Sequence, residues 1–196
     1  MQVEPGDVVV VKGKTVVPEE KKVYLAFNKP RGIVCTAEKR EKNNVIDYLS
    51  YPVRIYPVGR LDKDSEGLLL MTNDGAIVNG IMRARNRHEK EYQVEVNKET
   101  TPEFLKKMAS GVPILDIVTR PCRIQKTGER SFTIILTQGL NRQIRRMCEA
   151  LGYRVTKLKR VRIMNIHLKD LKTGEYRPLT EKELAELKKQ IGEEKR

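Results

Sequence analysis

Two segments of this chain, 90–96 (KEYQVEV) and 131–137 (SFTIILT), alternate apolar and polar residues with a period of two. Their apolar faces consist of Tyr92, Val94, Val96, Phe132, Ile134 and Leu136. This pattern is typical of antiparallel strands with one covered face. Further strand-like segments lie at 23–27, 54–58, 67–72, 119–125 and, in pieces, 153–168. The sequence therefore predicts a mixed, predominantly antiparallel sheet.

Fewer segments carry a helical pattern. In 141–151 the apolar residues recur at helical spacing and the segment ends at Gly152, a favoured residue after a helix. The apolar stripe consists of Ile144, Met147, Cys148 and Leu151. Helices are also predicted at 75–84, at 102–110, and from a capping box of Thr180 and Glu183 onward. Helices packed on such a sheet give an α+β fold.

Positive charge is concentrated in two stretches. The chain has 39 Lys and Arg against 26 Asp and Glu, a formal net charge of +13. Residues 83–90 carry a net +3 and residues 142–162 a net +7. Clustered arginine suits phosphate, whose oxygens accept paired hydrogen bonds. Nucleic acid is therefore the predicted partner, and a solvated basic face is the alternative.

Other function classes have no sequence signal. The three cysteines, Cys35, Cys122 and Cys148, lie far apart, which suits a reducing compartment, and no Cys/His spacing resembles a zinc site. There is no glycine-rich nucleotide loop, no apolar run of the roughly 18–20 residues that span a membrane, and no secretory signal pattern. We expect a cytoplasmic monomer that needs neither metal nor cofactor and has no membrane partner.

Residues 59–67 (GRLDKDSEG) offer the first candidates for chemistry. Asp62 lies beside arginine and between glycines, where a ligand can approach, although aspartate in such a place is more often a turn former. The side chains of Asp62 and Asp64 share a face if the chain is extended and diverge if it turns. Whether the two carboxylates form an acid/base pair therefore stays open.

The 141–151 helix and the 90–96 strand add basic and aromatic candidates. Arg142 and Arg146 lie one helical turn apart, with Arg145 between them and the buried edge, from where it can reach a carboxylate in a cleft. Lys90 and Tyr92 point to one face of their strand. The tyrosine is suited to core packing with its hydroxyl at the rim, or to stacking on a base.

Four motifs carry a resemblance to a known family: NKPRG (28–32), GRLDKDSEGLLLMTND (59–74), RHEKEY (87–92) and QGLNRQIRRM (138–147). They resemble those of RNA pseudouridine synthases of the RsuA/RluB/E/F family, in particular the RluF-type enzymes that act on large-subunit ribosomal RNA. The resemblance covers about 22–180 and implies the pseudouridine synthase catalytic fold over 21–180. Residues 1–20 then resemble a remnant of an N-terminal RNA-binding domain (the alpha-L motif) plus a linker, and 181–196 form a charged C-terminal helix.

The resemblance implies a mechanism without redox or energy input: uracil leaves the ribose, turns, and is reattached through ring carbon 5. Asp62 matches the catalytic aspartate, acting as nucleophile or as base. Arg145 matches the arginine that pairs with this aspartate, and Tyr92 matches the active-site tyrosine that stacks on the base.

The same resemblance implies RNA contacts. Arg60 would help to displace the target nucleotide, Ile144 would form an apolar wall, and Lys29 with Pro30 would buttress the cleft. The basic run 154–162 would grip the RNA backbone. The predicted RNA-contacting residues are Arg60, Arg83, Arg85, Asn86, Lys90, Asn141, Arg142, Ile144 and Arg146.

Two functions from different classes fit these residues. The first is isomerisation of a uridine to pseudouridine in RNA, with 23S ribosomal RNA as the expected substrate and transfer RNA as an open second one. The second is noncatalytic RNA binding or ribosome association on the same scaffold. Asp62, Tyr92 and Arg145 together favour the enzyme, because a carboxylate that faces phosphates would only weaken binding.

Overall fold

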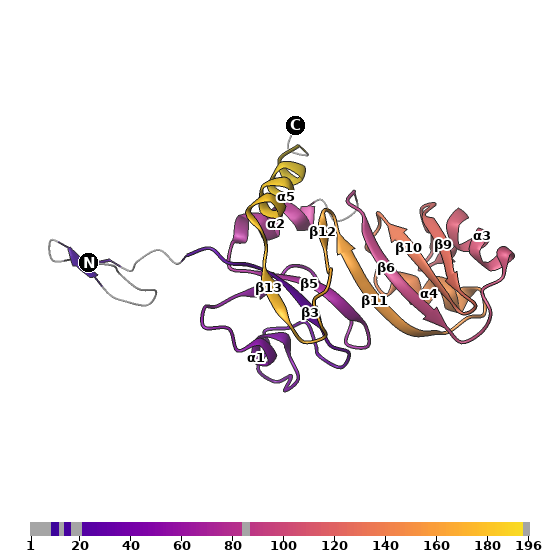
Figure 1. Cartoon of the computed structure of the whole chain (residues 1–196), viewed down its shortest axis with the longest axis horizontal. Helices are drawn as coiled ribbons and strands as arrows, with labels where there is room; N and C mark the ends of the chain where they lie inside the picture. The colour runs from indigo at the N-terminus through magenta and orange to yellow at the C-terminus, as the bar shows by residue number, and fades with distance from the viewer. Residues whose placement is uncertain (1–8, 12–13, 17–20, 84–86, 194–196) are drawn as a thin grey trace.

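A nine-stranded mixed sheet forms the framework of the protein (Figure 1). The structure is a computed structural model that describes residues 9–11, 14–16, 21–83 and 87–193. The main path of the sheet runs β13-β3-β5-β11-β6-β10-β9, with β4 on β5 and β12 on β11. These strands are β3 (Tyr24–Lys29), β4 (Tyr56–Pro57), β5 (Glu66–Thr72), β6 (Lys90–Val96), β9 (Arg123–Gly128), β10 (Ser131–Leu136), β11 (Val155–Ile163), β12 (Ile166–His167) and β13 (Tyr176–Pro178).

Two small hairpins and five helices complete the described chain. The hairpins are β1 (Val9–Val11) with β2 (Lys14–Val16) and β7 (Pro113–Ile114) with β8 (Ile117–Val118). The helices are α1 (Val45–Leu49), α2 (Gly75–Arg83), α3 (Pro102–Ser110), α4 (Gln143–Ala150) and α5 (Glu181–Glu193). The predicted α+β fold with a mostly antiparallel sheet is confirmed, and β5 with β11 forms a parallel pair inside it.

The two halves of the sheet are covered differently. The β3–β5 half has a buried cluster on each face, one formed with α2 and α5 and the other with α1. The β6–β10 half is covered by α3 and α4 on one face, where Val94, Phe132 and Ile134 are buried. On the other face Gln93 and Glu95 are exposed. Figure 1 shows α2 beside α5 over one half and α3 with α4 against the other.

The halves meet where β5 and β11 run in parallel. The register pairs Lys159 with Glu66 and Arg160 with Gly67. Gly67 has a φ of +108°, and a Cβ added there would lie 2.2 Å from the carbonyl oxygen of Arg160. The junction therefore requires glycine at position 67.

Most predicted elements appear, and one strand is displaced. The segments 90–96 and 102–110 coincide with β6 and α3, and the Thr180–Glu183 capping box is present. The strand predicted at 119–125 begins only at Arg123, because Thr119 and Cys122 bond to Val112 and Ala109 instead of to the sheet. Among the described residues, no helix has the length and apolarity to cross a bilayer.

Candidate active site

The turn between β4 and β5 presents Asp62 and Asp64. It is closed by a hydrogen bond from the Ser65 amide to the Asp62 carbonyl, at 3.0 Å. Leu61 is buried in the core and its amide donates to Sγ of Cys35 at 3.4 Å. The turn is thus anchored on the core, while the Asp62 side chain remains 35% exposed.

Lys29 fixes the same turn from inside the protein. This lysine is completely buried, and its Nζ donates to the carbonyls of Pro30, Ile33 and Lys63 at 2.9, 2.7 and 3.5 Å. Burial lowers the pKa of the Lys29 ammonium. The loop after β3 and the turn that carries Asp62 are therefore held together by one side chain, and Pro30 lies half-buried beside it.

Helix α4 brings the arginine motif to this turn. Ile144, Met147 and Cys148 are buried against the β6–β10 half, as the predicted stripe requires. Burial also raises the pKa of the Cys148 thiol to about 12. Because Arg145 lies beside this stripe, it too is buried, at 7% exposure.

In this structure the direct contacts of Arg145 are with the residues that follow Asp62, in place of the expected ion pair with Asp62 itself. Arg145 Nη2 donates to the Asp64 carbonyl at 3.0 Å and to Oγ of Ser65 at 3.1 Å, and Nη1 lies 3.6 Å from the Asp64 carboxylate. The reason is geometric: Arg145 enters from the buried side of α4 and meets the turn after Asp62. Burial lowers the pKa of Arg145. Arg145 thus holds the turn rather than the Asp62 carboxylate.

Arg142 is the direct partner of Asp62. Its Nη1 lies 3.5 Å from Oδ2 of Asp62, and its two terminal nitrogens donate to the Asp64 carboxylate. The hydrogen bonds from Arg142 lower the pKa of Asp64, and the same contact raises the pKa of Arg142. Arg142 has left-handed backbone geometry (φ 49°) at the N-cap of α4.

A cleft of about 630 Å³ lies between the halves of the sheet and brings Asp62 and Tyr92 together. Lys90 lines it beside Tyr92, which confirms that these two residues share a face of β6. Apolar parts of its wall are Ile144, Leu136, Leu158 and Ile81. Of the predicted RNA-contacting residues, the cleft is lined by Arg60, Lys90, Asn141, Arg142 and Ile144. Leu68 is fully buried in the core and does not line the cleft.

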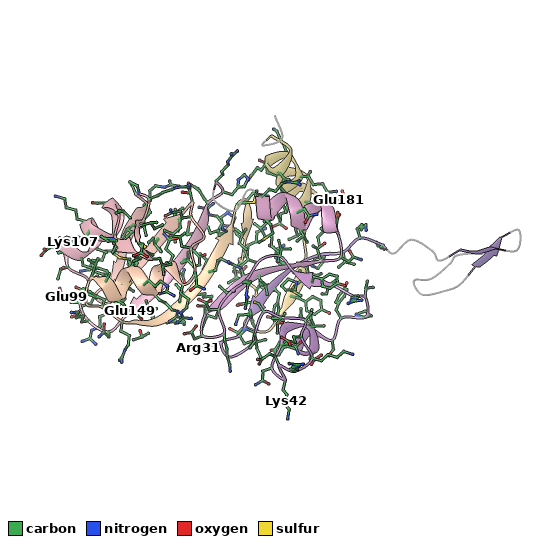
Figure 2. All side chains as sticks on the ribbon, turned by 180° about the vertical axis from the view of Figure 1, so that it is seen from behind. Arg31, Lys42, Glu99, Lys107, Glu149 and Glu181 are labelled. Atoms are coloured by element: carbon green, nitrogen blue, oxygen red, sulfur yellow. The ribbon has the colours of Figure 1, made fainter. Side chains whose placement is uncertain are left out.

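A second cavity, of about 600 Å³, lies on the other side of the turn. It shares Arg60, Asp62 and Arg142 with the cleft and adds Arg31 and Lys63. Arg31 follows β3, and Figure 2 shows it near the junction of the two halves; its Nη1 donates to the carbonyl of Thr156 at 3.3 Å. Asp62 is thus flanked by two openings that are rich in cationic side chains.

Some predicted RNA-contacting residues lie elsewhere. Arg146 folds back onto Asn141, donating from Nε to its carbonyl and from Nη2 to its side chain. Arg83 is exposed at the end of α2. Arg85 and Asn86 fall outside the described residues.

The basic run 154–162, which is predicted to grip the RNA backbone, is divided between the two faces of β11. Lys157 and Lys159 lie on the uncovered face of β11, opposite Glu95 and Gln93. Arg160 lies on the cleft face, opposite Tyr92. A strand sends successive side chains to opposite faces, so a run of charges along it is divided.

Sequence reasoning did not single out Arg160. The sequence did contain a signal for it. Leu158 and Arg160 lie two residues apart on a strand and therefore share a face, so the arginine occupies a position that is expected to be buried. Among the residues that the structure describes, no group of three or more His, Cys, Asp or Glu side chains could hold a metal ion.

Comparison with known proteins gives one consistent family. The profile described as RNA pseudouridylate synthase matches residues 23–150. The dual-specificity RNA pseudouridine synthase RluF of Escherichia coli K12 is 53% identical over 192 residues, which cover 97% of this chain. The chain spans 66% of the length of that relative.

Two further matches cover more of the relative. Ribosomal large subunit pseudouridine synthase B of Bacillus subtilis is 36% identical over 96% of this chain and 80% of its own length. A crystal structure of a pseudouridylate synthase superposes with a TM-score of 0.78 at 28% identity, over 95% of this chain and 83% of that one. The sequence motifs and the structural superposition thus identify the same family.

Proposed function

Because the chain belongs to the RNA pseudouridine synthase family, of the RluF type, we propose that it isomerises a uridine in RNA to pseudouridine with Asp62 as its catalytic group. One observation carries the proposal: Asp62 and Tyr92 come from different halves of the sheet and line a single cleft. That cleft is also lined by Arg60, Lys90 and Arg142. An acid and an aromatic ring inside a basic cleft suit a reaction on a flipped base.

Each side chain has a part in this proposal. Tyr92 stacks on the displaced uracil, and the Asp62 carboxylate acts on the ribose as nucleophile or as base. The glycosidic bond from ring nitrogen 1 breaks, the uracil turns, and a bond forms between ring carbon 5 and the ribose. The proton on carbon 5 is then lost, and nitrogen 1 takes up a proton. The steps are an isomerisation, so atoms and electrons balance without a co-reactant.

The surrounding residues position these groups. Arg60, which is exposed and lines both openings, occupies the space that the flipped nucleotide leaves in the RNA. Arg145 keeps the 62–65 turn in place through Ser65 and the backbone of Asp64, as a positioning residue. Lys29 and Pro30 support the same turn from below.

The proposed substrate is large-subunit ribosomal RNA, and the protein is proposed to act as a monomer in the cytoplasm. The sequence motifs support the substrate, and the B. subtilis relative is named for the ribosomal large subunit. Residues 21–180 form the proposed catalytic domain, which is followed by helix α5 (Glu181–Glu193).

The test is to incubate the protein with fragments of ribosomal RNA and to map new pseudouridines by mass spectrometry. Pseudouridine at a defined position, absent with Asp62→Asn, supports the proposal. RNA that binds but is never converted, in ribosomal and transfer RNA alike, would instead indicate the noncatalytic RNA-binding protein.

A further inference from the structure

Arg160 lies at the centre of the sheet, between the two halves. Its register partners are Gly67 on β5 and Tyr92 on β6. Directly opposite residues of neighbouring strands share a face, so Arg160 and Tyr92 point to the same side. The Nε of Arg160 donates to the carbonyl of Leu68 on β5 at 2.8 Å.

The guanidinium of Arg160 is buried but incompletely bonded. The residue is 5% exposed, and Nη2 is inaccessible with no hydrogen-bond partner among the described residues. Buried polar groups nearly always have partners, and an unpaired charged one is costly. The burial of Arg160 therefore leaves a hydrogen-bond donor that no described residue uses.

Arg145 also has a buried nitrogen, Nε, without a hydrogen-bond partner among the described residues, but unlike Arg160 it and the other neighbouring arginines contact carboxylates. Arg142 and Arg145 contact Asp64, and Arg162 contacts Glu89 and Glu91. Arg160 forms no ion pair with any carboxylate of the described chain. It does line the same cleft as Asp62 and Tyr92. Arg160 thus lines the cleft in which the substrate is proposed to lie, with hydrogen-bonding capacity that no described residue uses.

We propose that Arg160 is a substrate-contacting residue, which donates a hydrogen bond to an acceptor oxygen of the flipped nucleotide. This inference rests on the proposed function and deepens it. The oxygen belongs either to a carbonyl of the uracil or to the phosphate on its 5′ side. Arginine only donates, so contact with the carbonyl at ring carbon 4 would also select against cytidine, which presents an amino group there.

The experiment crosses variants of Arg160 with single-atom changes in the RNA. The full chain is incubated with RNA that carries uridine, 2-thiouridine or 4-thiouridine at the mapped target position. A fourth RNA carries a neutral methylphosphonate on the 5′ side of that position. Single-turnover rates are measured for the wild type, Arg160→Met and Arg160→Lys. The control is Arg162→Met, on the same strand, and thermal unfolding is recorded for every variant.

If Arg160 contacts the substrate, one of the changes in the RNA lowers the single-turnover rate of the wild type by about tenfold to a hundredfold. The same change should hardly lower the rate of Arg160→Met, which has already lost the contact. A thio-substituted base in that role assigns the contact to the uracil, and the methylphosphonate assigns it to the phosphate. Arg162→Met retains every atom effect of the wild type. Arg160→Lys recovers part of the rate, because it restores a donor.

The inference is overturned if each change in the RNA slows Arg160→Met by the same factor as it slows the wild type. It is also overturned if Arg160→Met converts uridine at the wild-type rate. If Arg160→Met fails to fold, the same cycle is run with Arg160→Lys, whose displaced ammonium should retain only part of the atom effect; an atom effect as large as that of the wild type overturns the inference. A wild type that makes no pseudouridine at all would refute the proposed function itself, which is a separate result.

Discussion

Arg142 binds the Asp64 carboxylate through both of its terminal nitrogens, at 3.1 and 3.0 Å, and its Nη1 lies 3.5 Å from Asp62. One side chain on α4 thus connects two acids of the turn between β4 and β5. Arg142 is 39% exposed and borders both cavities. In the proposed complex with RNA, it is therefore placed to exchange a carboxylate for a phosphate.

The first prediction concerns Asp62. Asp62→Asn should lower the conversion rate about a thousandfold or more, because the amide is neither nucleophile nor base. RNA affinity should stay within about twofold, since the removed negative charge does not attract phosphate. Rates come from mass spectrometry of the product and affinities from fluorescence anisotropy. The matched control is Glu41→Gln, at the edge of the neighbouring cavity, which should remain active. An Asp62→Asn protein with the wild-type rate would contradict the assignment.

The second prediction separates rate from affinity at Arg145. Arg145→Ala removes the bonds to Ser65 and the Asp64 backbone, so the turn loses its alignment. The rate should fall about a hundredfold, while RNA affinity changes less. Arg145→Lys should recover part of the rate. Arg146→Ala, one residue along on α4, should leave the rate nearly unchanged, and equal rate losses for the two alanine variants would refute this role.

The third prediction concerns the parallel junction. Gly67→Ala places a methyl group 2.2 Å from the Arg160 carbonyl at a φ of +108°. The free energy of unfolding should fall by about 3 kcal/mol, measured by urea denaturation. Gly192→Ala is the control, because nothing lies within 4 Å of a Cβ at that helical position. The control should be neutral or more stable by about 0.5–1 kcal/mol.

The fourth prediction is a pH dependence at Glu183. Hydrogen bonds from Arg177 lower the pKa of Glu183 to about 2 from 4.5. Because the pKa is lower in the folded state, the ion pair stabilises the protein above pH 4.5, and this contribution is lost as the pH falls toward 2. Glu183→Gln should cost about 2 kcal/mol at pH 7 and progressively less below pH 4.5.

The check is urea denaturation of both proteins between pH 7 and pH 3. Glu186→Gln, an exposed residue of the same helix, is the control and should follow the wild type throughout. A stability difference for Glu183→Gln that does not vary with pH would contradict the lowered pKa.

The fifth prediction concerns salt. RNA affinity should fall steeply with salt concentration, because bound phosphates release counterions. Arg60→Ala should reduce the slope of log affinity against log salt by about one. Lys107→Ala, on α3 and labelled far from Arg31 in Figure 2, should leave the slope unchanged. A flat salt response of the wild type would refute the phosphate contacts.

The regular parts of the fold could be predicted from the sequence because their determinants are local. The alternation of Tyr92, Val94 and Val96 predicted β6, and the helix predicted at 102–110 is α3, which begins with Thr101 as its N-cap. The order of the strands could not be predicted in this way, since the position of β11 between β5 and β6 depends on contacts between distant segments. The glycines and charges of the sequence located the turn at Asp62. They did not predict which side chains contact the turn.

Partners require three-dimensional geometry. The motif predicted that Arg145 meets Asp62, whereas the side chain reaches Ser65 and Asp64 from the buried side of α4. Arg160 was counted as part of the basic run 154–162. The alternation of side chains along β11, however, places it on the face that lines the cleft. A count of charge along the sequence does not distinguish the two faces of a strand.

The parallel pair of β5 and β11 has a kinetic consequence. Arg160 bonds to Leu68 across 92 positions of sequence, so the segments on either side of this junction must acquire much of their structure before it can close. Loop closure over such a distance is slow and has an entropic cost. Since Asp62 precedes β5 and Tyr92 lies on the neighbour of β11, a refolding chain should regain ordered helices and hairpins before it regains a working catalyst.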